Sequence, residues 1–362
     1  MAGSVSALTG HLIVVGLAGT TLDPSERRAL AEGRRAGVVL FKRNVEKDAG
    51  ASAFRQVAAL NRDVATAARE PALVAIDQEG GRVVRLGPPA LALPPMRRLG
   101  DRGDEALLRR VAEAQARELR ALGFTMSFAP VADVHTRPEN PIIGDRAFAS
   151  EPTDVARYAA AWAEGLAAGG LLACAKHFPG HGDTTTDSHL ALPRVDRSRE
   201  MLEATELMPF RALATNPAVP AMMTAHVVFP ALADEPATLS YAICTDLLRS
   251  KYRFKGVLFS DDLEMKAITL APGEAAVRSI LAGCDVLLVC SRADMADEVH
   301  EALAKECEKS PAFTARCGEA AARSLAMRRR AVPNVADDLD AVFAASRAVA
   351  SELAMTGKRA TA

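Results

Sequence analysis

Eight short apolar runs, each separated from the next by a longer amphipathic stretch, constrain the fold of this chain most. The runs cover residues 12–17, 37–42, 72–77, 125–131, 171–177, 219–225, 256–261 and 285–290. They are continuously apolar rather than alternating, which is typical of strands in a parallel sheet that is covered on both faces. The runs therefore predict an α/β fold with eight parallel strands.

The stretches between the runs have the composition and spacing of helices. Ala, Leu, Glu and Arg dominate residues 48–67, 104–122, 152–168, 198–213, 241–252 and 273–283. Asp23-Pro24 predicts the start of another helix, because Asp favours the N-cap and Pro the first helical position. Strands that alternate with helices in this way predict a single (β/α)8 TIM barrel. The runner-up is an open doubly wound sheet, but no GxGxxG follows the first run to support it.

After the eighth run, the chain is predicted to be helical. Helical patterns cover residues 293–308, 312–330 and 336–356. We expect these extra C-terminal helices to cover the outside of the barrel. The corresponding division is a catalytic barrel at 1–335 and a C-terminal helix and tail at 336–362.

The charge balance excludes several classes of function. The chain has 44 basic and 45 acidic residues and a formal net charge of -1, which gives no overall field for nucleic acid or an anionic membrane. We interpret the triple Arg328–Arg330 as a solvated helix end rather than a nucleic-acid site. No stretch approaches the roughly 20 apolar residues of a membrane-spanning helix. We therefore expect no nucleic-acid partner and no membrane partner.

Cysteine usage and the N-terminal sequence favour a reducing compartment. The six cysteines form no CxxC pair and no zinc-ligand spacing. Residues 12–18 are apolar, but no Lys or Arg precedes Arg27, so the basic region of a secretory signal is missing. We expect a cytoplasmic protein that acts as a monomer on a small molecule.

Reactive side chains follow five of the eight runs. Active sites of (β/α)8 barrels lie at the C-terminal ends of the strands, so these positions are the first candidates for a site. In chain order they are 77–82, Asp133 with Arg146, Lys176 with His177, His226, and 260–262. Polar residues that only serve the core would not concentrate at these ends, and the pattern therefore predicts an active site.

Residues 176–189, KHFPGHGDTTTDSH, combine three His, two Asp and one Lys in a loop that contains Pro and Gly. Two interpretations stay open from the spacing. The first is a metal site formed by His177, His181, Asp183 and His189, since His and carboxylate ligands suit zinc. The second is an acid–base dyad of Asp187 and His189. There the carboxylate raises the His pKa and keeps a proton available for a leaving group. Any one of these His could instead brace the loop, and His181 is the first candidate for that role.

Residues 256–265, GVLFSDDLEM, place two adjacent Asp at the end of a predicted strand. Neighbouring strand residues point to opposite sides, so we expect one Asp to face the pocket and the other to cap the following helix. A carboxylate at the floor of a pocket can act as a nucleophile or stabilise an oxocarbenium-like centre. The pattern alone also allows two solvent-facing caps.

Eight segments together match the motifs of one enzyme family. They are IDQEGGRVVRL (76–86), GFTMSFAPVADV (123–134), IGDRAF (143–148), AKHFPGHGDTTTDSH (175–189), MTAHVVFPAL (223–232), EPATLS (235–240), GVLFSDDLEM (256–265) and AGCDVLLVC (282–290). KHFPGHG followed by DxxxDSH, with SDDLxM about seventy residues later, is a highly specific combination. On these motifs the chain resembles glycoside hydrolase family 3, and within it the single-domain bacterial β-N-acetylglucosaminidases of the NagZ type.

The resemblance implies a (β/α)8 barrel that cleaves terminal β-linked sugars with retention, through a covalent glycosyl-enzyme. It implies Asp261 as the nucleophile, His189 as the acid/base and Asp187 as the partner of His189. It also implies a set of residues that hold the N-acetylglucosamine ring, namely Asp77, Arg85, Arg146, Lys176 and His177. The family's chemistry needs no metal and no other cofactor, which favours the dyad over the metal site.

The resemblance further implies an exo-acting enzyme. Its substrates would be peptidoglycan fragments in which N-acetylglucosamine is linked to 1,6-anhydro-N-acetylmuramic acid, and its role would be cell-wall recycling. Three alternatives remain. One is a phosphorylase, because a His acid/base does not repel an incoming phosphate. Another is a β-glucosidase or other exo-glycosidase of the same family, and the third is a metal-dependent barrel hydrolase.

Overall fold

The computed structural model describes residues 5–47, 51–186, 188 and 191–356. Within them, eight parallel strands close into a barrel in the order β1-β10-β9-β6-β5-β4-β3-β2. Their bounds are β1 Ile13–Gly16, β2 Gly37–Leu40, β3 Leu73–Ile76, β4 Met126–Ser127, β5 Leu172–Phe178, β6 Ala221–Thr224, β9 Val257–Asp262 and β10 Val286–Val289. The predicted (β/α)8 barrel and its eight strands are confirmed.

The barrel strands are buried on both faces, which explains their continuous apolar sequence. In β1, Val14 belongs to the cluster that fills the barrel interior, whereas Ile13 and Val15 belong to the cluster between the strands and the helices. Phe128 and Phe259 meet edge-on in the interior, with ring centroids 5.7 Å apart. Since successive residues face two apolar layers, polar side chains are left to the strand ends.

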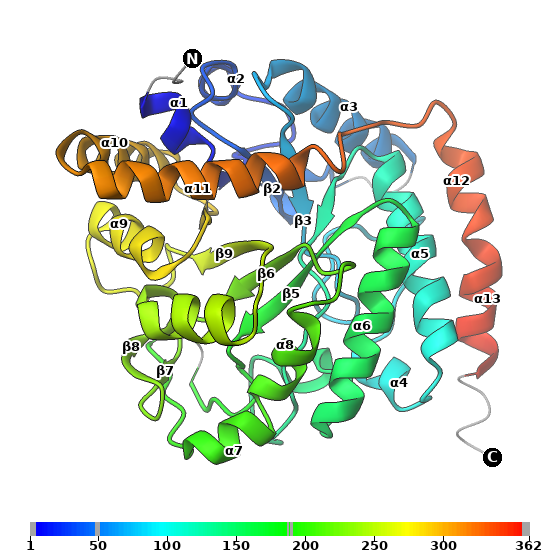
Figure 1. Ribbon diagram of the computed structural model, residues 1–362. Helices are drawn as coiled ribbons and strands as arrows, with labels where there is room; N and C mark the ends of the chain where they lie inside the picture. The colour runs from blue at the N-terminus through cyan, green and yellow to red at the C-terminus, as the bar shows by residue number, and fades with distance from the viewer. Residues whose placement is uncertain (1–4, 48–50, 187, 189–190, 357–362) are drawn as a thin grey trace.

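Helices surround the barrel (Figure 1). Their bounds are α1 Val5–Gly10, α2 Pro24–Ala31, α3 Ala51–Ala67, α4 Met96–Gly100, α5 Glu105–Ala121, α6 Pro152–Ala168, α7 Arg199–Ala204, α8 Leu207–Leu213, α9 Pro272–Ala282, α10 Ala293–Lys309 and α11 Pro311–Arg328. Shorter elements are the 3-10 helices η1 Lys42–Asn44, η2 Gly144–Arg146 and η3 Ala237–Leu239, the π-type helix η4 Ala242–Lys251, and an antiparallel pair of β7 Val228–Phe229 and β8 Ala233–Pro236. The predicted start at Asp23-Pro24 is confirmed, since Asp23 caps α2. None of the described helices has both the length and the apolar character that a membrane crossing requires.

Two predicted elements are shorter than the sequence pattern suggests. The fourth strand was expected over 125–131 but ends at Ser127, because Pro130 has no N–H with which to continue the ladder. The predicted helix 198–213 divides into α7 and α8. Pro209 cannot donate to the carbonyl of Thr205, so the helical hydrogen bonds are interrupted at this point.

The C-terminal helices α12 (Leu339–Ala345) and α13 (Arg347–Thr356) run beside α5 (Figure 1). They replace the single helix expected over 336–356. The rings of Phe343 and Phe54 pack with centroids 4.9 Å apart, and Arg110 forms a 2.5 Å ion pair with Glu352. The extra C-terminal helices therefore cover the outside of the barrel, whereas the domain boundary at residue 335 stays a prediction.

The C-terminal end of α11 closes the floor of the barrel. Arg328 is only 2% exposed there. Its guanidinium donates to the carbonyl oxygens of Pro71 at 2.5 Å and Ala36 at 3.3 Å, and lies 2.6 Å from Nδ1 of His11. The interpretation of Arg328–Arg330 as solvated is therefore wrong for Arg328, because its side chain binds the chain just before β2 and β3. Arg329 and Arg330 are exposed.

We predict that Arg328→Ala lowers the free energy of unfolding by about 3 kcal/mol, because it leaves a cavity and unpaired buried carbonyls. Urea unfolding followed by circular dichroism measures the change. The matched control is Arg329→Ala at the next, exposed position, which should change stability by no more than about 0.5 kcal/mol. Equally small effects in both variants would contradict the role assigned to Arg328.

Candidate active site

A cavity of about 230 Å³ lies at the C-terminal ends of the barrel strands. Its lining includes all five predicted sugar-binding residues and the predicted nucleophile, namely Asp77, Arg85, Arg146, Lys176, His177 and Asp261. They come from the ends of β3, β5 and β9 and from the loop after β4. Asp187 and His189 lie outside the described residues. Ser188, between them in the sequence, lines the same cavity.

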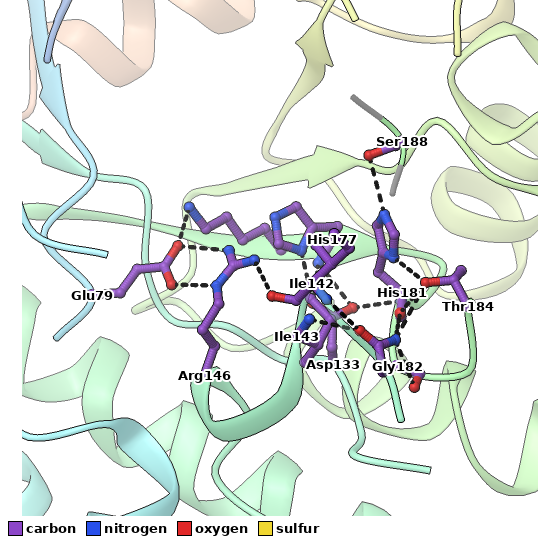
Figure 2. A network of polar contacts seen from close by, with 12 residues as sticks. Glu79, Asp133, Ile142, Ile143, Arg146, His177, His181, Gly182, Thr184 and Ser188 are labelled. Atoms are coloured by element: carbon purple, nitrogen blue, oxygen red, sulfur yellow. Dashed lines mark hydrogen bonds and ion pairs between the residues drawn. The ribbon is translucent and has the colours of Figure 1, made fainter. Parts of the chain in front are cut away.

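Five side chains form a row of alternating charges along one wall of this cavity. Asp77 accepts from Arg85 Nη2 at 2.9 Å through one carboxylate oxygen and from Lys176 Nζ at 2.7 Å through the other. Lys176 Nζ also lies 2.6 Å from Glu79 Oε1. Arg146 binds the Glu79 carboxylate with two hydrogen bonds, of 2.8 and 2.9 Å (Figure 2). Paired guanidinium–carboxylate bonds are strong and directional, so this wall is held in a fixed geometry.

The same contacts fix the charge state of the wall. Burial alone would raise the pKa of Asp77, but the charges of Lys176 and Arg85 outweigh it and lower that pKa. Burial would likewise raise the pKa of Glu79, and Arg146 and Lys176 lower it instead. For Lys176, burial would lower the pKa, but Asp77 and Glu79 raise it. These groups therefore remain charged at neutral pH and act as hydrogen-bonding partners rather than as proton donors.

Asp133 is a fully buried carboxylate behind His177. Its Oδ2 lies 2.7 Å from Nδ1 of His177, and its Oδ1 accepts the backbone N–H of His181 at 2.7 Å. Burial would raise the pKa of Asp133, but His177 and then His181 lower it. An ionised carboxylate at this distance keeps a proton on Nδ1 of His177, so Asp133 fixes both the tautomer and the orientation of that ring.

The loop after β5 is held by the loop after β4. Asn140 donates its amide hydrogens to the carbonyl oxygens of His181 at 2.8 Å and Gly182 at 3.0 Å. A Cβ at position 182 would lie 1.6 Å from the carbonyl oxygen of Val134, so only glycine allows the two loops to approach this closely.

His181 braces this loop, as one interpretation of the sequence predicted. Its Nδ1 lies 2.7 Å from Oγ1 of Thr184, and its Nε2 lies 3.3 Å from Oγ of Ser188 (Figure 2). Burial lowers the pKa of His181 to about 4, so the ring is neutral at pH 7. Ser188 is thereby tied to the base of the loop.

The described part of the loop does not form the alternative metal site. His177 contacts Asp133, and the carboxylate of Asp183 is bound by Arg197 through two hydrogen bonds of 2.9 Å. Among the described residues, no group of three or more His, Cys, Asp or Glu is arranged to hold a metal ion. The fourth ligand of that hypothesis, His189, lies outside them.

Asp261 and Asp262, the two adjacent Asp at the carboxyl end of β9, both line the cavity. The expectation that one of them caps the following helix is wrong, because Asp262 is followed by turns and α9 begins only at Pro272. Oδ1 of Asp262 instead accepts the backbone N–H groups of Glu264 and Cys290, each at 3.2 Å. Burial, with the nearby charge of Glu264, raises the pKa of Asp262 to about 7.

Glu79 and Asp133 lie at strand ends that the sequence pattern indicates, but no motif predicts a role for either. The signal for Glu79 was its position two residues after Asp77, which places both on one side of an extended segment. Phe41 was missed completely. It follows β2 and lines the cavity, and the guanidinium carbon of Arg85 lies 5.4 Å from its ring centroid.

The sequence of this chain is similar to those of known proteins. Residues 9–325 match the family model of the glycosyl hydrolase family 3 N-terminal domain. A β-hexosaminidase of Tolumonas auensis is 41% identical over 283 residues, which cover 77% of this chain and 82% of that protein.

Solved structures of the same family are also similar. A family 3 β-N-acetylglucosaminidase from Paenibacillus sp. FPU-7 matches with a TM-score of 0.87 and 36% identity, over 93% of this chain and 66% of that chain. NagZ from Neisseria gonorrhoeae in complex with N-trifluoroacetyl-D-glucosamine matches with a TM-score of 0.73 and 34% identity. That alignment covers 87% of this chain and 98% of that chain.

The raised pKa of Asp262 predicts a specific pH dependence. In the folded chain the Asp262 carboxyl group is protonated below about pH 7. In the unfolded chain it is protonated only below about pH 4. Asp262 therefore contributes stability that increases as the pH falls from about 7 to about 4. Each pH unit in that window is worth about 1.4 kcal/mol, so the full effect is on the order of 4 kcal/mol.

Asp262→Asn keeps the acceptor oxygen but cannot titrate. We expect the difference in unfolding free energy between wild type and Asp262→Asn to change across this pH window, with the wild type gaining on the variant as the pH falls. Urea unfolding of both proteins at a series of pH values measures it. A difference that stays constant from pH 8 to pH 4 would refute the assignment.

Proposed function

We propose that this chain, which belongs to glycosyl hydrolase family 3 and is a glycosidase, is a retaining exo-β-N-acetylglucosaminidase that removes terminal β-linked N-acetylglucosamine. The observation that carries the proposal is the shared cavity of Asp261 and the charged wall from Arg85 to Arg146. Its volume of about 230 Å³ is below the roughly 300–1,000 Å³ of pockets for drug-sized ligands. A cavity of this size suits one terminal sugar better than an internal stretch of a polysaccharide.

The charged wall supplies the hydrogen bonds that a hydroxyl-rich ring needs. We assign the binding of the sugar to Asp77, Arg85, Arg146, Lys176 and His177. Charge-assisted bonds from these groups are stronger than neutral ones and discriminate between hydroxyl positions. Because the wall is already ordered by its own ion pairs, it can hold the ring in the ground state and in the transition state without rearrangement.

The proposed reaction has two steps. In the first, a carboxylate oxygen of Asp261 bonds to the anomeric carbon while the bond from that carbon to the glycosidic oxygen breaks. His189, oriented by Asp187, gives its proton to the leaving oxygen. In the second, His189 takes a proton from water, whose oxygen bonds to the anomeric carbon and releases Asp261. Two displacements at one carbon retain the β configuration.

The roles of His189 and Asp187 rest on the family resemblance, because both residues lie outside the described part of the chain. The support from the structure concerns their neighbour. Ser188 lines the cavity that contains Asp261, and it is hydrogen-bonded to His181 at the base of the same loop.

For the natural substrates we propose muropeptides, the peptidoglycan fragments that carry N-acetylglucosamine on 1,6-anhydro-N-acetylmuramic acid. The corresponding role is cell-wall recycling by a monomer in a bacterial cytoplasm. The similarity to a neisserial enzyme bound to an N-acylated glucosamine supports N-acetylglucosamine as the sugar that is removed. The six cysteines are free and buried, as is common in proteins of reducing compartments.

The deciding experiment is hydrolysis of 4-nitrophenyl N-acetyl-β-glucosaminide by wild type and Asp261→Ala. We expect wild-type turnover that resists EDTA, and a loss on the order of 10³-fold or more in the variant, because the covalent step is removed. Azide should restore part of the lost rate and give the α-glycosyl azide, since it can replace a missing nucleophile. The matched control is Asp234→Ala at an exposed position, which should leave turnover unchanged.

The same assay separates the alternatives. A 1-phosphate sugar formed in the presence of phosphate would identify a phosphorylase, and faster cleavage of the β-glucoside would identify a β-glucosidase. Loss of activity on chelation would instead support a metal site in the loop 176–189. Full activity of Asp261→Ala would remove the covalent mechanism.

Glu79 is predicted to position the sugar-binding cations. Glu79→Gln keeps the shape but removes the charge that holds Arg146 and Lys176 together. We expect KM for the chromogenic substrate to rise about tenfold, with a smaller change in kcat, because ground-state and transition-state contacts weaken together. The control is Glu301→Gln, which changes an exposed ion pair with Lys305. Unchanged KM in folded Glu79→Gln would exclude this positioning role.

A further inference from the structure

A second cavity, of about 550 Å³, lies at the opposite end of the barrel. It is bounded by the segment before β6, the segment before β9 and the C-terminal part of α11. Val219 and Pro220 directly precede β6, and Gly256 directly precedes β9. The cavity therefore opens at the amino ends of these strands, whereas the candidate active site lies at their carboxyl ends.

Every charged side chain that lines this cavity is a cation. Among the described residues that line it, the four are Arg253, Lys255, Arg323 and Arg330, and none is Asp or Glu. Arg253, Lys255 and Arg330 are exposed, and within the described ranges none of these three side chains forms an ion pair or a hydrogen bond. Their charges are thus available to a ligand.

The fourth cation, Arg323, forms ion pairs with two carboxylates. Glu319 is exposed and lies 3.8 Å away, and Asp285 is shared with two other guanidinium groups. Asp285 is fully buried. Its oxygens lie 2.6 Å from Arg249, 3.1 Å from Arg316 and 3.0 Å from Arg323. One buried negative charge therefore faces three positive charges directly behind the cavity wall. Even with Glu319 counted, cations outnumber carboxylates around the cavity, in a chain whose formal net charge is -1.

Arg253 has an unusual backbone conformation. Its φ is 61°, the one positive φ found for a non-glycine residue among the described residues. This left-handed conformation is unfavourable by about 1 kcal/mol for a residue with a Cβ, whereas glycine adopts it without strain. Arg253 thus occupies a position where local backbone preference favours glycine, and Arg253→Gly should remove the cation without unfolding the loop.

The size and walls of the cavity favour an organic phosphate over a bare ion. Guanidinium and ammonium groups bind phosphate oxygens well. Pro217, Phe254 and Met327 line the cavity beside the cations and give it an apolar part. A volume of about 550 Å³ lies within the roughly 300–1,000 Å³ of small-molecule pockets that combine apolar walls with a few charged groups.

We propose that this cavity is a binding site for a nucleotide-sized organic phosphate, with the phosphates on Arg253, Lys255 and Arg330 and the organic part against the apolar wall. The site is separate from the cavity of Asp261, so it does not depend on the function proposed there. A ligand that binds only the folded chain raises its melting temperature.

ADP is the probe, and isothermal titration calorimetry and thermal melting are the measurements. We expect saturable binding that weakens with added salt, and a rise in Tm with ADP concentration. Arg253→Gly and the double variant Lys255→Gln/Arg330→Gln should each weaken binding about tenfold or more, which corresponds to about 1.4 kcal/mol. The matched control Arg329→Gln, next to Arg330 but not in the cavity lining, should bind ADP like wild type.

Additional measurements on the same variants, and with other ligands, test the site and the class of ligand. Melting without ligand confirms that each variant is folded, and hydrolysis of the chromogenic glycoside should be unchanged in all of them. Adenosine should not bind, and inorganic pyrophosphate should bind more weakly than ADP. The proposal is overturned if ADP fails to bind, if the variants bind it like wild type, or if N-acetylglucosamine displaces it. Pyrophosphate binding as tight as that of ADP would overturn the organic part of the proposal.

Discussion

Burial of the barrel strands on both faces determines where the chemistry of this protein can lie. Val14 faces the barrel interior and its neighbours Ile13 and Val15 face the helices, so within such a strand neither side tolerates an unpaired charge. Along the barrel strands and the segments that flank them, charged groups are therefore confined to the two ends of the barrel. At the carboxyl ends they line the cavity of Asp261, and at the amino ends they gather around Asp285 and Arg328.

The charged wall of the candidate active site follows from the same constraint. Buried charges are costly, and pairing offsets that cost only when every group finds a well-oriented partner. Glu79 meets this condition for two cations at once, Arg146 and Lys176, and Asp77 does so for Lys176 and Arg85. Such a network contributes more to a fixed arrangement of hydrogen-bonding groups than to stability. A fixed arrangement is what recognition of one sugar among many similar ones requires.

The two ends of the barrel differ in how completely their charges are paired. At the carboxyl ends, the two carboxylates of the wall are each shared between two cations. At the amino ends, Asp285 is shared by three arginines, of which Arg323 also pairs with Glu319. Arg253 and Lys255 have no carboxylate partner within the described chain. An excess of unpaired positive charge over an apolar wall has no evident use in holding the barrel together, which is why we interpret that end as a second binding site.

The sequence alone determined the strands, because a run that is apolar on both faces fits few structures other than a covered parallel sheet. It also determined which strand ends carry reactive side chains, and its motifs indicated Asp77, Arg85, Arg146, Lys176, His177 and Asp261 together, all of which line one cavity. The roles of these residues, and of Asp187 and His189, stay predictions.

Only the tertiary structure decided how the charges pair. Glu79 and Arg146 are 67 positions apart, and Asp133 and His177 are 44 apart. The raised pKa of Asp262 and the burial of Arg328 also depend on segments distant in the sequence. Local patterns record backbone preference and periodicity, but the energy of a buried charge depends on which groups the closed barrel places beside it.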